Sequence, residues 1–264
     1  MNFANQVIER CQSTNDLARD LAEKGYPHGT WISSRIQESG RGRLGRKWSS
    51  IEGNLFLSYL TRIEPKALWS WIPLTTAVAI AQCLIRHFPD LGIRVKWPND
   101  LWIVQPGVEG KLGGILCEGA SSIHSFVVVG IGLNCRAAPD PQEVGQPVVD
   151  LASSVRIREL SADDIRAPLI ESLNRCFERL KVEGTNWIAR DYEKMSLFAP
   201  GTSVCWGDPA HEAKVIGLGP SAELRVQYAS GDVRHLFSEE VRVRPSGLNW
   251  DVGRSLLKAG GSRP

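Results

Sequence analysis

Residues 37–48, with the sequence QESGRGRLGRKW, constrain this chain more than any other stretch. They hold three glycines and, between and after these, four cationic side chains: Arg41, Arg43, Arg46 and Lys47. Glycine lets the backbone turn sharply and approach a ligand closely. The planar guanidinium of arginine can hold a phosphate or carboxylate with two hydrogen bonds. We therefore expect an anion-binding loop that is mobile when empty and ordered by its ligand.

Within this stretch, residues 40–45 match the G-x-G-x-x-G fingerprint of dinucleotide-binding domains. That fingerprint has a physical meaning only where a helix starts at it, because the helix N-terminus binds the pyrophosphate. Residues 46–53 lack the apolar spacing of a helix, and residues 54–60 have the pattern of another strand. The sequence thus excludes a dinucleotide-binding crossover. Taken alone, the stretch is most simply a solvated basic loop or a contact to nucleic acid.

The composition narrows the class of protein. The chain has 264 residues, 42% of them hydrophobic, which suits one large domain with a buried core and one small domain. A net charge of +2 indicates no general affinity for nucleic acid or membranes. We find no signal peptide and no apolar run long enough to cross a bilayer. The six cysteines form no C-x-x-C pair, so neither a zinc site nor a redox motif is indicated, and a reducing cytoplasm is favoured.

The spacing of apolar residues predicts a mixture of helices and strands up to about residue 199. Helices are expected over residues 13–25, 69–88, 161–180 and 186–194, and strands over 30–37, 54–60, 93–97, 101–104, 111–117 and 126–133. Pro168 should kink the third helix or shift its start beyond Arg166. Residues 137–148 read as a proline-rich loop. From residue 202 onward, short strands separated by glycine and proline turns predict a small β-barrel or sandwich, followed by a loose tail.

Four further motifs place polar side chains at helix starts, turns and glycine-containing strands. They are S-T-N at residues 13–15, K-W-P-N-D at 96–100, K-L-G-G-I at 111–115 and G-I-G-L-N at 130–134. Glycines inside a strand often mark the close approach of a ligand or another backbone. The first three motifs also have a simpler interpretation when each is taken alone: a helix cap, a hairpin turn, and a solvated lysine at the start of a strand.

Together with the basic stretch, and in this order, these motifs resemble those of biotin protein ligases, in the short form without an amino-terminal DNA-binding domain. The resemblance covers most of residues 7–180 and, more weakly, the C-terminal β module. Gln37 and the G-R-G-R-x-G-R-x-W pattern are specific to the family when they occur with K-W-P-N-D. Ser39 and Leu44 depart from it, since the family often has alanine and arginine there. Leu44 removes one cation from the loop.

The resemblance implies an α/β (α+β) fold. A mixed β-sheet backed by helices would form a catalytic domain over residues 1–199, with an SH3-like β-barrel over 200–246 and a loose tail over 247–264. It implies a two-step reaction, in which ATP and Mg²⁺ activate biotin as biotinyl-5′-AMP with release of pyrophosphate. Biotin then passes to a lysine on the biotin carrier domain of a carboxylase. A cytoplasmic monomer or homodimer is expected, with neither DNA nor a membrane as a partner.

The resemblance also implies roles for individual residues. Lys111 would bridge the biotin carboxylate and the α-phosphate, and Arg43 would close over the adenylate phosphate. The residues expected to bind biotin are Ser13, Thr14, Asn15, Gln37, Gly40, Arg41, Gly42, Arg43, Lys111, Gly113, Gly114 and Gly132. Those expected to bind the nucleotide are Arg43, Trp48, Lys96, Asn99, Lys111 and Asn134, with Asp100 as a candidate Mg²⁺ ligand. Among the biotin residues, Ser13, Thr14 and Gln37 would pair with the ureido group, and the strand glycines would make room for the bicyclic ring.

Three alternatives stand beside this interpretation. A lipoate ligase would share the fold and the acyl-adenylate chemistry, but it does not normally carry the G-R-G-R-x-G-R loop. A non-enzymatic nucleic-acid or repressor module would need more positive charge or a helix-turn-helix segment before Val7. An inactive relative is disfavoured because Gln37, Arg43, Lys96 and Lys111 are all present.

Overall fold

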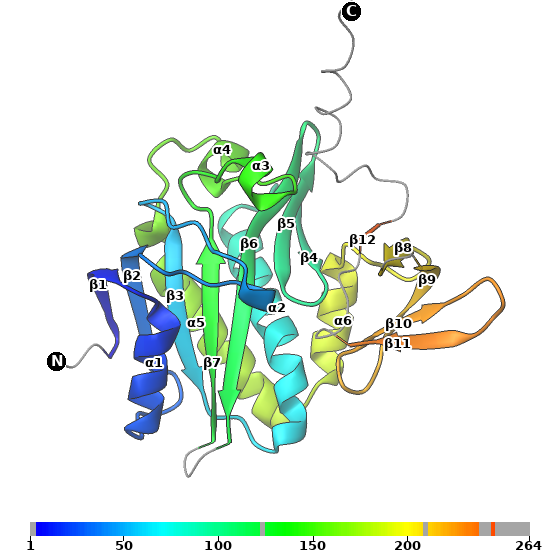
Figure 1. The fold of residues 1–264 in the computed structure, drawn as a ribbon, viewed down its shortest axis with the longest axis horizontal. Coiled ribbons are helices and arrows are strands. Elements are labelled where there is room, and N and C mark those ends of the chain that lie inside the picture. Colours follow the sequence, from blue (N-terminus) through cyan, green and yellow to red (C-terminus); the bar gives the residue numbers. More distant parts are fainter. Residues whose placement is uncertain (1–3, 122–124, 208–210, 238–243, 246–264) are drawn as a thin grey trace, which may run out of the picture.

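A seven-stranded sheet with the strand order β1-β2-β3-β7-β6-β5-β4 forms the centre of the molecule (Figure 1). The structure is a computed structural model, which describes residues 4–121, 125–207, 211–237 and 244–245. The strands are β1 Gln6–Cys11, β2 Trp31–Gln37, β3 Leu55–Thr61, β4 Ile93–Lys96, β5 Asp100–Gln105, β6 Val108–Ala120 and β7 Phe126–Leu133. Only β1 and β2 are paired in parallel within this sheet, and its other neighbours are antiparallel. The mixed sheet expected from the sequence is therefore confirmed.

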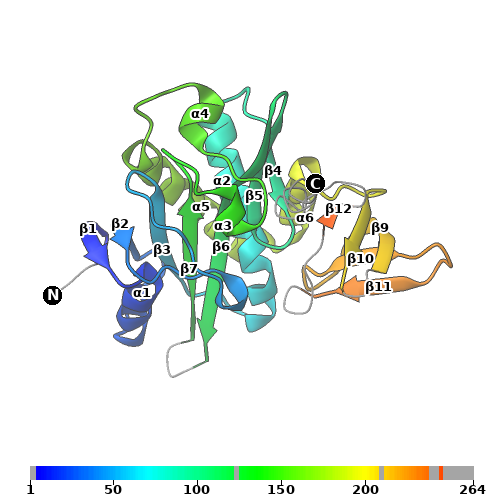
Figure 2. The same ribbon diagram turned by 45° about the horizontal axis from the view of Figure 1, so that its top comes forward.

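Helices cover both faces of this sheet (Figures 1 and 2). They are α1 Thr14–Glu23, α2 Ile72–His87, α3 Pro141–Val144, α4 Leu151–Val155, α5 Ala162–Glu183 and α6 Asn186–Met195. Side chains alternate between the two faces of a strand. In β7, Val127 and Val129 accordingly belong to the core with α2 and α5, whereas Phe126 and Val128 pack with α1.

On the face of β7 that lies under α1, the residues change from large and apolar to glycine near the N-terminus of that helix. Phe126 and Val128 are followed on the same face by Gly130 and Gly132, which have no side chain to fill the space above the sheet. Gly114 of β6 lies opposite Gly132 and has the same orientation. The helix α1 thus covers the sheet where these residues are apolar, and a space remains above the sheet where they are glycine.

Several elements differ from the prediction. β1, α3 and α4 were not expected. The helix α5 begins at Ala162, with Ser161 and Asp164 forming a reciprocal capping box, and Pro168 lies inside it. The predicted shift of its start beyond Arg166 is therefore wrong, because the capping box fixes the first turn.

The helix before β4 also corrects a prediction. Lys66–His87, which combines a 3₁₀ turn with α2, is long and apolar enough to cross a membrane by length and composition. The expectation that no such run exists is wrong in that sense. However, 67% of its most apolar window is buried within the protein. Ala77–Ala81 are fully buried against the sheet and α5, as in the core helix of a globular domain.

The C-terminal strands form a separate antiparallel sheet of five strands with the order β11-β10-β9-β8-β12. They are β8 Ser203–Trp206, β9 His211–Leu218, β10 Leu224–Gln227, β11 Val233–Leu236 and β12 Arg244–Pro245. Within the described residues β11 and β12 are the two ends of this sheet and do not pair, so a closed SH3-like barrel is not confirmed. Most of the strand expected at residues 241–244, and the tail at 247–264, lie outside the described residues.

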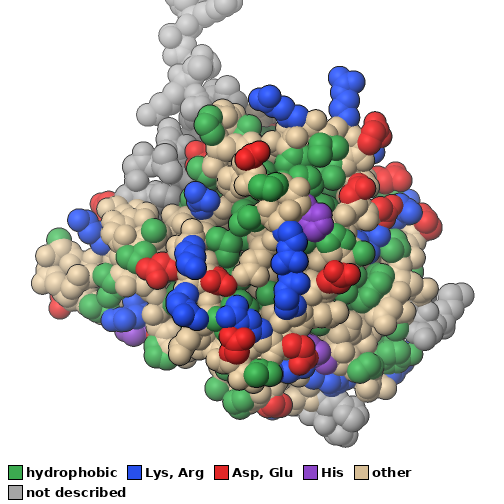
Figure 3. Space-filling model, turned by 180° about the vertical axis from the view of Figure 1, so that it is seen from behind, with side chains coloured by type: hydrophobic (Ala, Val, Ile, Leu, Met, Phe, Trp, Pro, Cys, Tyr) green, Lys and Arg blue, Asp and Glu red, His purple; other side chains and the backbone are tan. Residues whose placement is uncertain are grey.

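Both sheets contribute to one hydrophobic core. Val204 and Leu224 belong to the same cluster of buried side chains as Leu55 and Val95. The opposite face of the molecule from that seen in Figure 1 carries interspersed cationic and anionic side chains (Figure 3). On α5, Arg179 pairs with Glu183 at 2.8 Å.

Candidate functional site

A cavity of about 290 Å³ lies in the hollow at the N-terminus of α1. The basic loop, residues 37–48, crosses in front of the sheet beside it, and α3 lies on the other side (Figures 1 and 2). Of the site residues expected from the sequence, the cavity is lined by Ser13, Thr14, Asn15, Gln37, Arg41, Gly42, Arg43, Trp48, Asn99, Asp100, Lys111, Gly114, Gly132 and Asn134. The structure thus brings together motifs that are far apart in the sequence.

Three expected residues do not line the cavity. Gly113 faces the other side of the sheet, where an added methyl group would lie 2.5 Å from the Gly132 carbonyl oxygen. This glycine allows close packing of β6 against β7, so it makes no room for a ligand. Lys96 is buried with its ammonium group 4.9 Å from the ring centre of Trp102. Gly40 lies at the base of the loop, where an added methyl group would be 3.2 Å from Gln37 Nε2.

One end of the cavity is polar and is built around the first turn of α1. Ser13 is the N-cap residue but caps no backbone N–H with its side chain, contrary to the simple cap interpretation. Instead, the Thr14 backbone N–H donates to Gln37 Oε1 at 2.8 Å. Thr14 and Asn15 are buried, and only 3% and 4% of their respective surfaces remain exposed. This end offers hydroxyl and amide groups that are largely shielded from water. A ligand without matching donors and acceptors would bind poorly there, because an unpaired buried polar group is costly.

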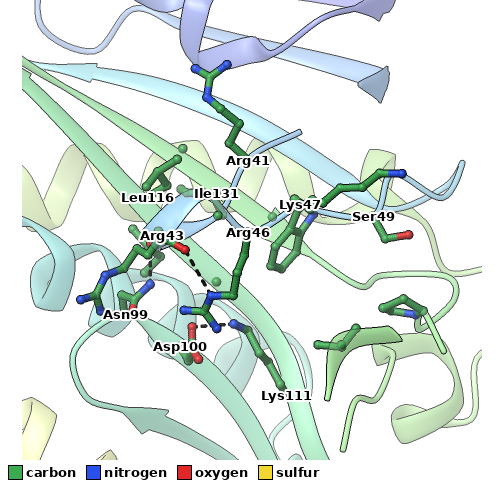
Figure 4. A pocket seen from close by; sticks show the side chains of 18 of the residues that line it. Arg41, Arg43, Arg46, Lys47, Ser49, Asn99, Asp100, Lys111, Leu116 and Ile131 are labelled. Atoms are coloured by element: carbon green, nitrogen blue, oxygen red, sulfur yellow. Dashed lines mark hydrogen bonds and ion pairs between the residues drawn. The ribbon is translucent and has the colours of Figure 1, made fainter. Parts of the chain in front are cut away.

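The other end of the cavity is cationic. Lys111 Nζ lies 2.7 Å from Asp100 Oδ1, and Arg43 donates from Nη1 to Asn99 Oδ1 at 2.9 Å. Figure 4 shows both cations reaching the K-W-P-N-D turn, with the guanidinium of Arg46 lying beside the Lys111–Asp100 pair. Asn99 is held in place because its Nδ2 donates to the Ile115 carbonyl oxygen at 2.7 Å. The turn therefore fixes the cations around a space suited to an anion.

The basic loop is closed by its own backbone. The Gly42 N–H donates to the Arg46 carbonyl oxygen at 2.7 Å, and the Trp48 N–H donates to the Gly40 carbonyl oxygen at 2.8 Å. Leu44 has a φ of 57° and is 75% exposed at the tip. The loop is thus a short hairpin.

Arg41 ties this hairpin to α1. Its guanidinium points away from the other loop cations (Figure 4) and donates to both carboxylate oxygens of Asp16, at 2.5 and 2.9 Å. Hydrogen bonding from Arg41 lowers the pKa of the Asp16 carboxyl below its ordinary value of 3.8.

The indole ring of Trp48 packs directly on the strand glycines. A methyl group added to Gly132 would lie 2.4 Å from Trp48 Cε2, and one added to Gly114 would lie 3.3 Å from Trp48 Cζ3. Lys111 Nζ lies 5.6 Å from the Trp48 ring centre on the same side of the sheet. Gly114 and Gly132 were expected to make room for a ligand ring, and in this structure the ring that they admit is that of Trp48.

Several lining residues were missed by the sequence analysis. Residues 139–148 contribute Pro139, Glu143, Val144, Gln146 and Val148. This stretch was taken as a proline-rich loop, but Asp140 caps α3 by accepting from the Gln142 N–H at 2.8 Å. An aspartate followed by a proline at the first helical position is a recognisable start signal. Gly130 was noted only as part of its motif.

Among the described residues no group of three or more His, Cys, Asp or Glu side chains could hold a metal ion by itself. The chemical capacity of the site therefore lies in its charge and shape. It combines a polar end, glycines that admit a flat ring, and cations that can bring two anionic groups together.

Comparison with known proteins points to the family that the sequence motifs resemble. Residues 7–134 match the model of the biotin/lipoate A/B protein ligase family. The chain is 33% identical over 200 residues to the bifunctional ligase/repressor BirA of Escherichia coli, covering 73% of this chain and 59% of that protein. It is 34% identical over 140 residues to the biotin--[acetyl-CoA-carboxylase] ligase of Mycobacterium tuberculosis, covering 51% of this chain and 50% of that protein.

Among solved structures, the biotin protein ligase of Aquifex aeolicus in complex with biotin and ATP superposes with a TM-score of 0.76 at 25% identity. The alignment covers 91% of this chain and 98% of the other. The chain spans about half the length of the first curated relatives that it matches. From its motifs, its sheet and these similarities, residues 7–134 of this chain form a domain of the biotin/lipoate A/B protein ligase family.

Proposed function

We propose that this chain is an ATP-dependent biotin protein ligase. It would form biotinyl-5′-AMP and pyrophosphate from biotin and ATP, and then transfer biotin to a lysine on a carboxylase carrier domain. The observation that carries the proposal is one cavity with a buried polar end at α1 and a cationic end at Lys111 and Arg43. Biotin has the matching form: a polar ureido ring, an apolar tail and a carboxylate.

In this proposal the ureido ring binds between the first turn of α1 and Gln37, and the carboxylate reaches Lys111. The biotin carboxylate and the ATP phosphates repel each other, so cations at their meeting point lower the barrier. Lys111 and Arg43 are the proposed catalytic residues because they come from different elements and flank the same turn. Asn99 orients Arg43, and Asn134 and residues 139–148 are proposed to contact the nucleotide.

The carboxylate of Asp100 lies beside Lys111, where the phosphates are proposed to bind. This fits Mg²⁺, which usually binds one or two carboxylates together with substrate phosphates. When bound there, Mg²⁺ would neutralise phosphate charge. We also propose a cytoplasmic location, supported by six free cysteines. The C-terminal strands are proposed to belong to an SH3-like module over residues 200–246, beside a catalytic domain over residues 1–199.

The test is to incubate the full chain with MgATP and either biotin or lipoate, and to measure pyrophosphate release. Release that depends on biotin, followed by labelling of a biotin carrier domain, is expected. Release with lipoate alone would identify a lipoate ligase. No release with either acid would overturn the assignment as an acyl-adenylate ligase.

A further inference from the structure

A chain of polar side chains links α1 to the sheet beside the cavity, and it includes two residues without an assigned role, Ser58 and Glu118. Ser58 Oγ on β3 lies 2.7 Å from Thr14 Oγ1 and 2.6 Å from Asn15 Oδ1. Asn15 Nδ2 donates to Glu118 Oε2 on β6 at 2.6 Å. Ser58 is completely buried, and Thr14 and Asn15 are nearly so. The central part of this chain is therefore shielded from bulk water, whereas the Glu118 side chain at its end is 25% exposed.

Glu118 fixes the direction of this chain, because a carboxylate only accepts hydrogen bonds. Asn15 must turn its NH₂ group to Glu118, and so it presents Oδ1 to Ser58. The Ser58 hydroxyl has one hydrogen and donates it to Asn15 Oδ1, which leaves Ser58 Oγ to accept from the Thr14 hydroxyl. Gln37 Oε1 accepts the Thr14 backbone N–H and, at 3.0 Å, is the other acceptor within reach of the Thr14 hydroxyl. Whether Ser58 Oγ or Gln37 Oε1 takes this one hydrogen, Thr14 Oγ1 has only lone pairs to offer to the cavity.

Gly130 makes room for this arrangement. It pairs with Ser58 on β3, and a methyl group added to it would lie 2.5 Å from Asn15 Oδ1. The amide of Asn15 thus lies flat on the backbone of β7. At the far end, guanidinium groups of Arg19 and Arg41 lie 3.4 and 3.9 Å from the Glu118 carboxylate. Both ends of the chain are held in place.

We propose that Glu118, acting through Asn15 and Ser58, is a positioning residue that makes Thr14 an acceptor for a ring N–H of biotin. The same polarity leaves the Gln37 NH₂ group free to donate to the ureido oxygen, since Gln37 Oε1 faces α1. This inference rests on the proposed function. A ureido ring has two N–H donors and one carbonyl acceptor, whereas the dithiolane ring of lipoate has neither. This chain of hydrogen-bonded side chains would therefore favour the ureido ring of biotin over the dithiolane ring of lipoate.

The experiment measures, by calorimetry, how tightly the full chain binds biotin and each of the two derivatives methylated at one ring nitrogen. In the wild type, methylation at the nitrogen facing Thr14 should weaken binding by at least about 10-fold, as expected for a lost hydrogen bond in a buried site. Glu118→Leu should weaken binding of biotin by about 10-fold. The variant should then bind biotin and the derivative methylated at the nitrogen facing Thr14 with nearly equal affinity. Glu118→Gln keeps an acceptor for Asn15, so it should restore most of the discrimination.

Ser58→Ala interrupts the same chain at a position where the smaller side chain fits, and it should reduce the discrimination as Glu118→Leu does. Glu183→Leu, the same substitution on the surface of α5, is the matched control and should leave all three affinities unchanged. If Glu118→Leu and Ser58→Ala weaken all three ligands equally, the two residues are merely structural and the inference is overturned. Absence of biotin binding by the wild type would overturn the proposed function together with this inference.

Discussion

Gly113 and Gly132, on the paired strands β6 and β7, face opposite sides of the sheet. Substituting each of them tests a different property. Gly113→Ala would place a methyl group 2.4 Å from Leu133 Cδ2 and 2.5 Å from the Gly132 carbonyl oxygen. Because one neighbour is backbone, the central strands must separate. We expect Gly113→Ala to lower the free energy of unfolding by about 1–3 kcal/mol, measured in urea.

Gly132→Ala should act on the site instead of the fold. Its methyl group would meet only the Trp48 ring among the nearest atoms, at 2.4 to 2.7 Å. We expect the loop that carries Trp48 to yield to the added methyl group. Unfolding should then change little, whereas the Trp48 indole N–H resonance should shift and biotin binding should weaken. Equal loss of stability in both variants would contradict this assignment of faces.

Lys111 tests the proposed chemistry. Its ammonium group is 2.7 Å from Asp100 Oδ1, and both side chains are largely buried. Lys111→Ala should slow adenylate formation by about 10²–10³, as for loss of one donor to a developing anion. Biotin affinity should fall far less, because the contacts at the polar end remain. Single-turnover pyrophosphate release and calorimetry measure the two effects.

A control separates the role of Lys111 from simple neutralisation of Asp100. The double variant Lys111→Ala with Asp100→Asn removes the unpaired carboxylate that the single variant leaves behind. Asp100→Asn alone is the baseline, because Asp100 is also the candidate Mg²⁺ ligand. If Lys111 contacts the reacting anions, the double variant is far slower than Asp100→Asn. Equal rates for these two variants would show that the lysine only offsets the charge of Asp100.

Residues in recognisable motifs could be placed from the sequence, but their partners could not. Lys111 and Asn99 stand in specific motifs, and both line the cavity. Ser58 and Glu118 stand in ordinary strand sequences, and their contacts arise from the pairing of β3 and β6 with β7. The face of Gly113 was missed because a pair of glycines carries no pattern of burial. Side-chain alternation assigns a face only where the neighbouring residues differ in polarity.

At the scale of elements, the basic loop is a hairpin fastened to α1, and Asp16→Ala should loosen it. The Arg41 and Asp16 side chains are 39% and 49% exposed, so their pair contributes less than about 1 kcal/mol. We expect amide exchange in residues 40–48 to rise by up to about 5-fold without ligand. The expectation that biotinyl-AMP protects this loop stays a prediction for the same experiment.

Two comparisons test the fastening. Glu183→Ala breaks a similarly exposed pair with Arg179 on α5 and should leave loop exchange unchanged. Lowering the pH should imitate Asp16→Ala. Arg41 lowers the pKa of Asp16 in the folded protein. The pair therefore stabilises the loop fully at pH values above 3.8, the ordinary pKa, and this stabilisation is lost as the pH falls through the lowered pKa of the folded state. Loop exchange that is indifferent to Asp16→Ala would show that the backbone hydrogen bonds alone close the hairpin.

Long and strongly patterned elements were predictable, whereas short or edge elements were not. The strand expected at residues 126–133 is confirmed as β7, because its apolar run is buried in the centre of the sheet. β1 was missed because Gln6–Cys11 is an edge strand whose side chains are partly or fully exposed. α3 and α4 are single turns, stabilised by caps at Asp140 and Asp150. Such turns depend on local hydrogen bonds, which a periodicity of apolar residues does not reveal.

At the scale of the whole molecule, two tryptophans of the catalytic part of the chain hydrogen-bond to the loop between β9 and β10 of the C-terminal sheet. Trp71 Nε1 donates to the Pro220 carbonyl oxygen at 2.8 Å, and Trp97 Nε1 donates to the Ala222 carbonyl oxygen at 2.9 Å. Both side chains are buried in the core shared by the two sheets. Because the core is continuous, the two parts should unfold together.

Trp97→Phe and Trp71→Phe test whether this connection reaches the chemistry. Each substitution keeps an aromatic ring but leaves a carbonyl oxygen without its donor, so each should lower the free energy of unfolding by about 1–3 kcal/mol. Trp97 directly precedes Pro98 and the turn that carries Asn99 and Asp100, which line the cavity. We therefore expect Trp97→Phe also to slow adenylate formation several-fold.

Trp71 supplies the matched comparison because it lies before α2 and does not line the cavity. Trp71→Phe should lose stability to a similar degree while single-turnover adenylate formation stays near the wild-type rate. The rates must be compared at a temperature where each variant is fully folded, since unfolding would lower both. If Trp97→Phe is destabilised but forms the adenylate as fast as Trp71→Phe, the C-terminal sheet supports the fold alone. A rate loss confined to Trp97→Phe would instead show that this sheet holds the K-W-P-N-D turn in its active geometry, through the single hydrogen bond to Ala222.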